Sequence, residues 1–160
     1  MNFKKKYTDY AGALTALQRF CAYQERSHSE VRNRLLEIGI YGEELDRIIV
    51  DLINDNFLNE ERFAKVFARG KSNIKKWGRI KIENELKFRK ISTYCIRKGM
   101  EEIDEHIYVE NLRQLLRKKH VAFPDQDNQF RTEQKLYQYA IQKGYEADLI
   151  SSILKEMREK

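Results

Sequence analysis

Residues that break helices are scarce in this chain, and their scarcity constrains its fold more than any other feature. The 160 residues include one proline, Pro124, and seven glycines. Apolar side chains recur at spacings of three and four, as at Leu14, Leu17 and Cys21, which is the period of a helix with one buried face. The alternation of apolar and polar residues that is typical of strands is nearly absent. The sequence therefore predicts an all-α fold.

Helix boundaries are marked by capping residues. Ser27 followed by Glu30 has the spacing of a capping box, and Gly39 lies where a helix would end. Asn59 can cap a further helix that begins with acidic residues, which favour the positive end of the helix dipole. These signals predict helices at about residues 10–24, 28–38, 42–55, 59–74 and 79–89, with another opening near residue 92.

The apolar pattern repeats along the chain. A shift of 51 residues aligns Leu35, Ile40, Leu45, Ile49 and Leu52 with Leu86, Ile91, Ile96, Met100 and Ile103. The helix end at Gly39 shifts by 105 residues onto Gly144, after which one deletion aligns Leu45 with Leu149. We interpret this periodicity as three tandem three-helix units whose neighbours cover each other's apolar faces. The predicted boundaries are a basic tail at 1–9 and units at 10–58, 59–103 and 104–160.

Motifs that carry chemistry are missing from the sequence. His28, His106 and His120 have no partner at zinc-ligand spacing, and no glycine-rich phosphate-binding loop occurs. We therefore predict a binding protein without a cofactor or metal, and not an enzyme. Cys21 and Cys95 lie on apolar helical stripes and are predicted to be reduced structural residues. No apolar run is long enough to cross a membrane, and the first residues do not form a secretion signal, so we expect a cytoplasmic protein.

Charge is distributed unevenly along the chain. The net charge is +6, but residues 28–61 carry −6 and residues 62–100 carry +11. The basic segment has thirteen lysines and arginines against two acids, Glu83 and Glu85. An unbalanced basic surface attracts polyanions such as nucleic acids. The alternative is a solvated helix surface, but such surfaces normally mix both signs of charge.

The basic segment therefore supplies the candidate binding residues. We expect Lys75, Lys76 and Arg79 to be exposed, so that reversing them to Glu would weaken binding and leave the fold intact. The candidate residues for binding nucleic acid or a nucleoprotein filament are Lys71, Lys75, Lys76, Arg79, Lys81, Lys87, Arg89, Lys90, Arg97 and Lys98.

Aromatic residues of the same region have two interpretations. Trp77 lies beside Gly78, and it either closes a core at a helix junction or stacks on a ligand. A second group is predicted to form the joint between the first two units rather than a binding site. This group comprises Phe57, Leu58, Phe63, Ala64 and Phe67.

One segment resembles the signature of a known family. The run Phe57-Leu58-Asn59-Glu60-Glu61-Arg62-Phe63-Ala64, followed by Gly78-Arg79-Ile80, is similar to the RecX family of bacterial recombination regulators. The opening Ala13-Leu14-x-x-Leu17 also matches, and the resemblance covers about residues 10–158. Asn59 stands where the family commonly has Asp, and Lys90 replaces the usual Gly before Ile91, so that junction needs a turn without glycine.

The resemblance implies a fold and a partner. It implies a curved, elongated array of three-helix repeats that binds along the groove of the RecA–DNA filament, and we expect the protein to be a monomer. It further implies inhibition of the ATPase, co-protease and strand-exchange activities of RecA, in DNA repair, recombination and the SOS response. The acidic residues 28–61 would suit basic patches on protein subunits. Two alternatives stay open: a stand-alone helical-repeat protein that binds single- or double-stranded nucleic acid, and a protein–protein scaffold with an incidental basic surface.

Overall fold

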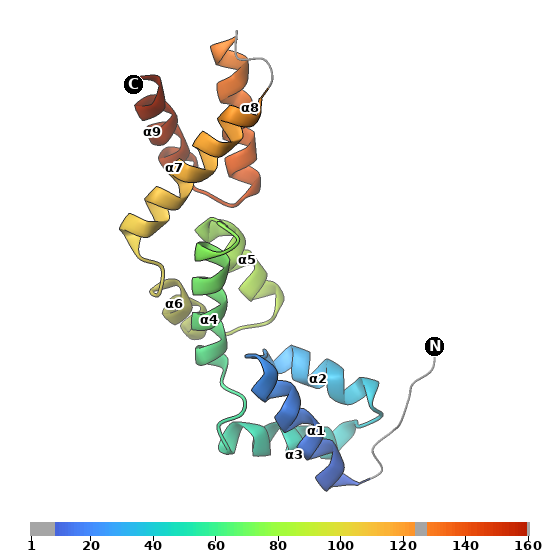
Figure 1. Cartoon of the computed structure of the whole chain (residues 1–160). Helices are drawn as coiled ribbons and strands as arrows, with labels where there is room; N and C mark the ends of the chain where they lie inside the picture. The colour runs from blue at the N-terminus through green and yellow to red at the C-terminus, as the bar shows by residue number, and fades with distance from the viewer. Residues whose placement is uncertain (1–8, 124–127, 160) are drawn as a thin grey trace.

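The fold is an elongated array of helices. The computed structural model describes residues 9–123 and 128–159, so most of the predicted basic tail and Pro124 lie outside the described residues. The helices are α1 (Tyr10–Tyr23), α2 (His28–Glu37), α3 (Gly42–Asn54), α4 (Glu60–Asn73), α5 (Arg79–Phe88), α6 (Thr93–Met100), α7 (Glu105–Ala122), α8 (Gln129–Gln142) and α9 (Ala147–Arg158). Figure 1 shows α1–α3, α4–α6 and α7–α9 as three successive units, here called the first, second and third unit. The prediction of an all-α fold of three-helix repeats is confirmed.

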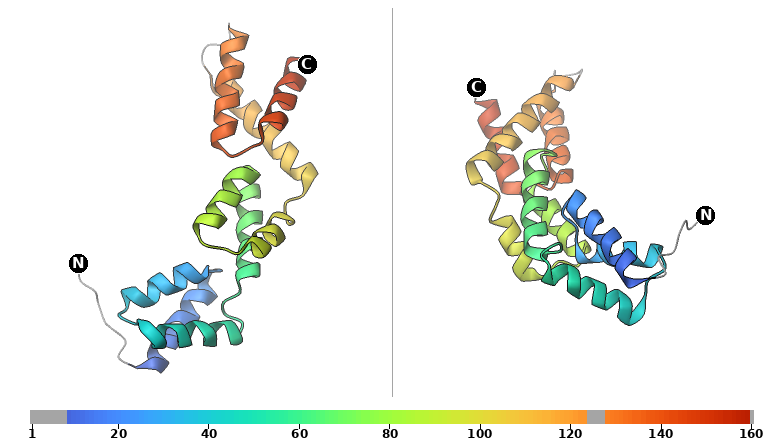
Figure 2. Two further views of the ribbon diagram at one scale, coloured as in Figure 1. Left: turned by 180° about the vertical axis from the view of Figure 1, so that it is seen from behind. Right: turned by 60° about the horizontal axis from the view of Figure 1, so that its bottom comes forward.

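The units follow one another in a curved line. In both views of Figure 2, the first and third units lie on opposite sides of the second. No helix in the two described ranges is long and apolar enough to cross a membrane.

The predicted caps hold the helix starts. The Ser27 hydroxyl accepts from the backbone N–H of Glu30 at 3.2 Å, and the Glu30 side chain accepts in return from the N–H of Ser27, which completes a capping box. The Asn59 side chain accepts from the N–H of Arg62 at 2.8 Å at the start of α4. Asn in place of the family's usual Asp therefore still caps this helix.

The junction between the second and third helices is the same in every unit. Gly39, Lys90 and Gly144 occupy equivalent positions, and their φ angles are 89°, 61° and 96°. In each unit, the N–H of the residue after this position donates to a carbonyl near the end of the second helix. These hydrogen bonds run from Ile40 to Leu35 at 2.9 Å, from Ile91 to Leu86 at 3.1 Å and from Tyr145 to Ala140 at 3.2 Å. The turn therefore forms without glycine at Lys90, where a side chain occupies the left-handed region that glycine favours.

The register of the third unit differs from the sequence-based alignment. The third helix of each unit has its N-cap at Tyr41, Ser92 or Glu146. Ser92 lies 51 residues after Tyr41, and Glu146 lies 105 residues after Tyr41. The shift of 105 thus continues through the last helix, and no deletion is needed. Leu45 aligns with Ile150, which is fully buried, because the turn before α9 has the same length as its counterpart in the first unit.

Each unit closes its own hydrophobic core. Phe57 and Leu58 pack in the core of the first unit, whereas Phe63 and Ala64 belong to the core of the second and Phe67 packs against it. The prediction that these five residues form the joint between the units is therefore wrong. The reason is that the third helix of each unit packs on the other two and covers their apolar faces.

Neighbouring units consequently share little apolar surface. The first and second cores have no residue in common, while the half-buried Ile103 packs against both the second and the third core. The expectation that neighbours cover each other's apolar faces is therefore wrong for the joint between the first and second units. At the joint between the second and third units it holds only through contacts such as that of Ile103. The joints are instead built from polar groups.

The two cysteines are structural, as predicted. Cys21 and Cys95 are buried free thiols in the first and second cores. Burial raises the pKa of the Cys21 thiol to about 11, so this group is protonated and unreactive at neutral pH.

Candidate nucleic-acid interface

The ten candidate cations lie on the second unit but have different surroundings. Lys71 is near the end of α4, and Lys75 and Lys76 are in the turn that follows it. Arg79, Lys81 and Lys87 are on α5, Arg89 and Lys90 are in the next turn, and Arg97 and Lys98 are on α6. The structure separates them into residues that hold the units together and residues that are available to a ligand.

Arg79 joins the second unit to the third. Its guanidinium pairs with Glu146 at 2.8 Å and with Glu105, and it lies 3.9 Å from the ring centroid of Tyr108. The Tyr108 hydroxyl accepts from the backbone N–H of Arg79 at 2.9 Å and donates to Glu146. Burial alone would raise the pKa of Glu146, but hydrogen bonds from Tyr108 and Arg79 outweigh it and lower that pKa.

Lys76 belongs to the same joint. Its ammonium donates to the Asn111 side chain at 3.0 Å, and its carbonyl accepts from the Tyr145 hydroxyl at 2.9 Å. The expectation that Lys76 and Arg79 are exposed is therefore wrong. Reversing Arg79 to Glu would place its carboxylate against those of Glu105 and Glu146, so the proposed reversal would disrupt the joint as well as any ligand contact.

Two glycines bring the backbones of this joint together. The N–H of Gly78 donates to the Lys143 carbonyl at 2.7 Å, and the N–H of Ile80 donates to the Gly144 carbonyl at 3.0 Å. A Cβ at Gly78 would lie 2.1 to 2.3 Å from backbone atoms of Gly144 and Tyr145, which leaves no room for a side chain. The second and third units are thus fastened by backbone hydrogen bonds in addition to side-chain contacts.

Arg89 joins the second unit to the first. Its guanidinium pairs with Glu30 at 2.6 Å and with Glu85 at 3.4 Å, while its carbonyl accepts from the Ser29 hydroxyl at 3.2 Å. Arg62 adds a pair with Glu25 at 2.6 Å. Arg62 and the acidic partners of Arg79 and Arg89 were not predicted from the sequence, because every pair except Arg89–Glu85 joins residues 26 or more positions apart.

Trp77 carries two ammonium groups on a partly buried ring. The Nζ atoms of Lys71 and Lys81 lie 4.8 and 4.4 Å from the Trp77 ring centroid, and Phe67 packs edge-to-face against the same ring with centroids 6.4 Å apart. Trp77 packs against the second core, which supports the first of its two interpretations. Its ring holds Lys71 and Lys81 in place instead of offering a free surface to a base. We call Lys71, Lys75, Trp77 and Lys81 the Trp77 cluster.

A second basic surface lies on α6. The Arg97 guanidinium carbon and the Lys98 Nζ lie 5.5 and 5.6 Å from the ring centroid of Tyr94. Arg97 is exposed and lines a shallow groove together with Lys87 of α5. Lys87 pairs with Glu83 at 3.5 Å, but both side chains are exposed and such a pair stabilises little.

Half of the candidates have no acidic partner among the residues that the structure describes. Within residues 9–123 and 128–159, no ion pair involves Lys71, Lys75, Lys81, Lys90 or Arg97. Lys75, Lys90 and Arg97 are exposed, and Lys71 and Lys81 are half-buried on Trp77. These five cations can bind an external polyanion without breaking an internal ion pair, and they form the candidate interface.

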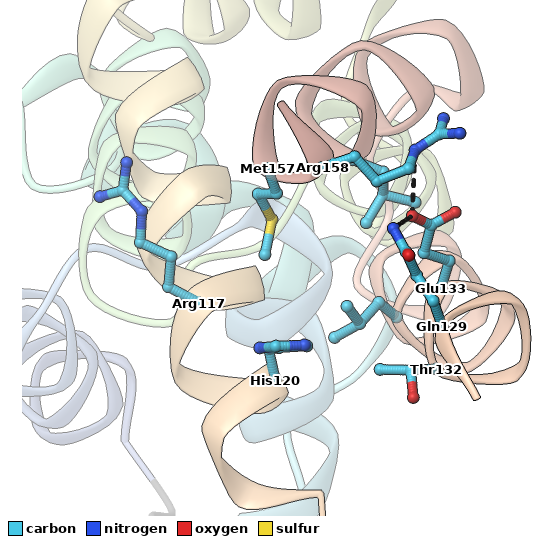
Figure 3. Close-up of a pocket in the computed structure, with 9 residues that line it drawn as sticks. Arg117, His120, Gln129, Thr132, Glu133, Met157 and Arg158 are labelled. Carbon is cyan, nitrogen blue, oxygen red and sulfur yellow. Dashed lines mark hydrogen bonds and ion pairs between the residues drawn. The ribbon is translucent and has the colours of Figure 1, made fainter. Parts of the chain in front are cut away.

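A groove of about 480 Å³ separates α7, α8 and α9 in the third unit. Figure 3 shows His120 of α7 and Met157 of α9 projecting into it. On its rim, Glu133 pairs with Arg158 at 3.0 Å and accepts from Gln129 at 3.3 Å. The carboxylate is thus held by a cation and an amide, an arrangement that suits helix packing better than proton transfer. No cluster of three or more metal-ligating side chains occurs in the described part of the chain.

Two family models match the chain. The model described as "RecX, second three-helix domain" matches residues 59–100, and "RecX, third three-helix domain" matches residues 106–154. Among curated proteins, the chain is similar to "Regulatory protein RecX" of Bacillus cytotoxicus, with 27% identity over 141 residues. The same protein of Bacillus thuringiensis is 24% identical over 141 residues. Both alignments cover 88% of this chain and 52% of the relative, so the chain spans about half the length of the curated relatives it matches.

Solved structures share the fold. The crystal structure of RecX from Lactobacillus salivarius superimposes with a TM-score of 0.82 at 22% identity, covering 94% of this chain and 97% of that one. A second crystal structure, of regulatory protein RecX, gives a TM-score of 0.80 at 22% identity and covers 90% of this chain and 70% of the other. The array of three-helix units is therefore an architecture that these proteins have in common.

Proposed function

The chain belongs to the RecX family, and we propose that it is a regulatory protein that binds the RecA–DNA filament and inhibits the RecA recombinase. In this proposal it acts as a monomer in the cytoplasm, during DNA repair, recombination and the SOS response, and catalyses no reaction itself. The proposal rests on the family together with the charges of the second unit.

The observation that carries the proposal is the set of five cations that have no acidic partner among residues 9–123 and 128–159. Lys71 and Lys81 lie over the Trp77 ring, which fixes them so that less side-chain entropy is lost when a phosphate binds, and the exposed Lys75 is two residues before Trp77 in the chain. The DNA of a filament presents phosphates at short, regular intervals, and each cation that neutralises one releases a condensed counterion. An elongated array suits such a partner, because several cations can follow one backbone.

The acidic segment 28–61, most of which lies in the first unit, supports a protein component in the partner. Residues 28–61 carry −6, and Glu43 and Asp46 are exposed on α3. A duplex or single strand would repel this surface, whereas basic patches on protein subunits would attract it. Complementarity of this kind raises the association rate and fixes orientation more than it raises affinity. A nucleoprotein filament offers both kinds of surface.

The same cations also fit a second function, that of a stand-alone nucleic-acid-binding protein. The five free cations would bind naked DNA equally well, so they favour neither function. Only the acidic surface and the family favour the filament. An assay that includes RecA separates the two functions.

The test is single-strand-dependent ATP hydrolysis by RecA, measured with increasing amounts of this protein. We expect inhibition by the wild type and weak inhibition by the variant Lys71→Gln/Lys75→Gln/Lys81→Gln. The matched control is Lys118→Gln/Lys135→Gln/Lys155→Gln, which removes the same charge from exposed positions of the third unit and should inhibit like the wild type. Unchanged ATP hydrolysis with the wild-type protein, despite DNA binding, would support the stand-alone function instead.

A further inference from the structure

The helices α5 and α6 form a helix-turn-helix. Residues 89–92 connect them, with Lys90 in the left-handed region and the Ser92 side chain accepting from the N–H of Cys95 at 3.2 Å. In proteins that bind duplex DNA with this motif, the second helix enters the major groove and the first crosses the backbone. The motif alone says nothing about binding, because each unit of the array has the same three-helix plan.

The second helix of this motif is held rigidly from behind. Cys95 and Ile96 are buried in the second core, and Gly99 lies directly against α4. A Cβ at Gly99 would be only 2.7 Å from the carbonyl oxygen of Ala64, so the two helices are in backbone contact. The opposite side of α6 therefore faces outward on a fixed support, which is the condition for reading a rigid ligand.

The outward side of α6 differs from that of the equivalent helices. Its exposed residues Thr93, Tyr94 and Arg97 contribute no apolar contact to the core. At the positions of Tyr94, Arg97 and Lys98, α3 has Glu43, Asp46 and Arg47, and α9 has Asp148, Ser151 and Ser152. All six of these counterparts are exposed. Among the three third helices, α6 thus has a face that combines two cations with an aromatic ring.

The side chains on this face fit a duplex better than a single strand. Single strands are bound by stacking bases on open aromatic rings. Trp77, which precedes α5, is covered by two lysines, and the exposed ring of Tyr94 on α6 has two cations within 5.6 Å of its centroid. Arg97 is exposed and pairs with no acid in the described part of the chain, and a guanidinium can donate two parallel hydrogen bonds to guanine O6 and N7 in the major groove. Lys87 of α5 lines the same groove as Arg97, and Lys90 is in the turn between α5 and α6.

We propose that α6 inserts into the major groove of double-stranded DNA, with Arg97 contacting base edges and Lys87, Lys90 and Lys98 contacting phosphates. This inference rests on the DNA binding in the proposed function and names the duplex as the strand form that α6 takes. In this proposal the Trp77 cluster contacts phosphates along the DNA backbone, whereas α6 contacts base edges inside the major groove.

The test uses fluorescence anisotropy with a labelled 20-base-pair alternating G·C duplex and a second duplex in which every guanine is 7-deazaguanine. The replacement removes the N7 acceptor from the major groove and leaves base pairing and phosphates unchanged. We expect the wild type to bind the modified duplex about fivefold or more weakly. Arg97→Lys keeps the charge but not the paired donors, so it should bind both duplexes equally, with a salt dependence like that of the wild type.

Two controls make the outcome specific. Lys155→Gln removes one charge from an exposed position on α9 and should keep the preference for unmodified guanine. The thermal unfolding curve of Arg97→Lys should match the wild type, because Arg97 is exposed. Equal binding of both duplexes by the wild type would overturn the proposal, and so would tighter binding to a 20-base oligothymidine, which stays single-stranded, than to the unmodified duplex. Neither result involves RecA. Inhibition of the RecA ATPase by this protein would therefore still support the proposed function, even if the proposal for α6 failed.

Discussion

Gly78 offers a direct test of how the second and third units are joined. Its backbone has φ −78° and ψ 164°, which alanine adopts without strain, so Gly78→Ala changes sterics and little else. The new Cβ would lie 2.1 Å from the backbone carbon of Gly144. Non-bonded carbon atoms prefer a separation of about 3.5 to 4.0 Å, so the two backbones must move apart by more than about 1 Å.

The size of the effect follows from the hydrogen bonds that this movement breaks. The bonds from Gly78 to Lys143 and from Ile80 to Gly144 measure 2.7 and 3.0 Å, and both would exceed normal hydrogen-bond length. Each is worth about 0.5–1.5 kcal/mol, so we expect Gly78→Ala to lower the free energy of unfolding by about 1–3 kcal/mol. The Arg79 network beside it would be strained in addition.

The assay is urea unfolding followed by far-ultraviolet circular dichroism and by the fluorescence of Trp77, the single tryptophan, which reports on the second unit. Gly78→Ala should lower the midpoint and separate the two signals, because the third unit would then unfold apart from the second. Gly70→Ala is the control, since its Cβ would meet nothing within 4 Å inside α4 and should stabilise by about 0.5–1 kcal/mol. A Gly78→Ala protein as stable as the wild type, with coincident signals, would refute the interlocked joint.

Three further predictions concern single residues. Lys90→Gly should raise the melting temperature, because Lys90 has a φ of 61° and a non-glycine residue in the left-handed region costs the folded state about 1–2 kcal/mol. The greater freedom of glycine in the unfolded chain cancels part of this gain. A lower melting temperature for Lys90→Gly would contradict the prediction. The pKa of Glu146 is lowered in the fold, so its contribution to stability is complete above its ordinary pKa of 4.5 and is lost as the pH falls through the lowered value. Glu146→Gln should therefore weaken the dependence of stability on pH in the acid range, and an unchanged acid profile in urea titrations would count against the network. Cys21 and Cys95 should react with a thiol reagent at pH 8 far more slowly in the native than in the denatured protein, and equal rates would show that they are not buried.

The repeat could be predicted from sequence because it depends on local chemistry. Gly39 and Gly144 mark turns that need a left-handed residue, and Ser27 and Asn59 can cap helices without any distant partner. Lys90 could be aligned with the two glycines by its spacing alone. The register of α9 was predicted incorrectly because Leu149 and Ile150 are both apolar, and only packing shows which of them is fully buried.

The role of each cation could not be predicted in the same way. Counting charges over residues 62–100 treats Arg79 and Arg89 as surplus, although their partners Glu146 and Glu30 lie 67 and 59 residues away. For the Arg79–Glu146 pair, the sequence does mark the position of the acid. Glu146 directly follows the junction Gly144-Tyr145 and is the N-cap residue of α9. Pairing between units depends on how the units are placed, which the sequence pattern does not specify.

The most direct test of the account is the salt dependence of binding to a preformed RecA filament on single-stranded DNA. Each phosphate contact on a single strand contributes about 0.7 to the slope of log affinity against log salt. We predict that Lys71→Gln/Lys75→Gln/Lys81→Gln binds with a slope lower by about 2 than that of the wild type, and that Lys118→Gln/Lys135→Gln/Lys155→Gln keeps the wild-type slope. Equal slopes for the wild type and the first variant would contradict the claim that the Trp77 cluster contacts the DNA of the filament.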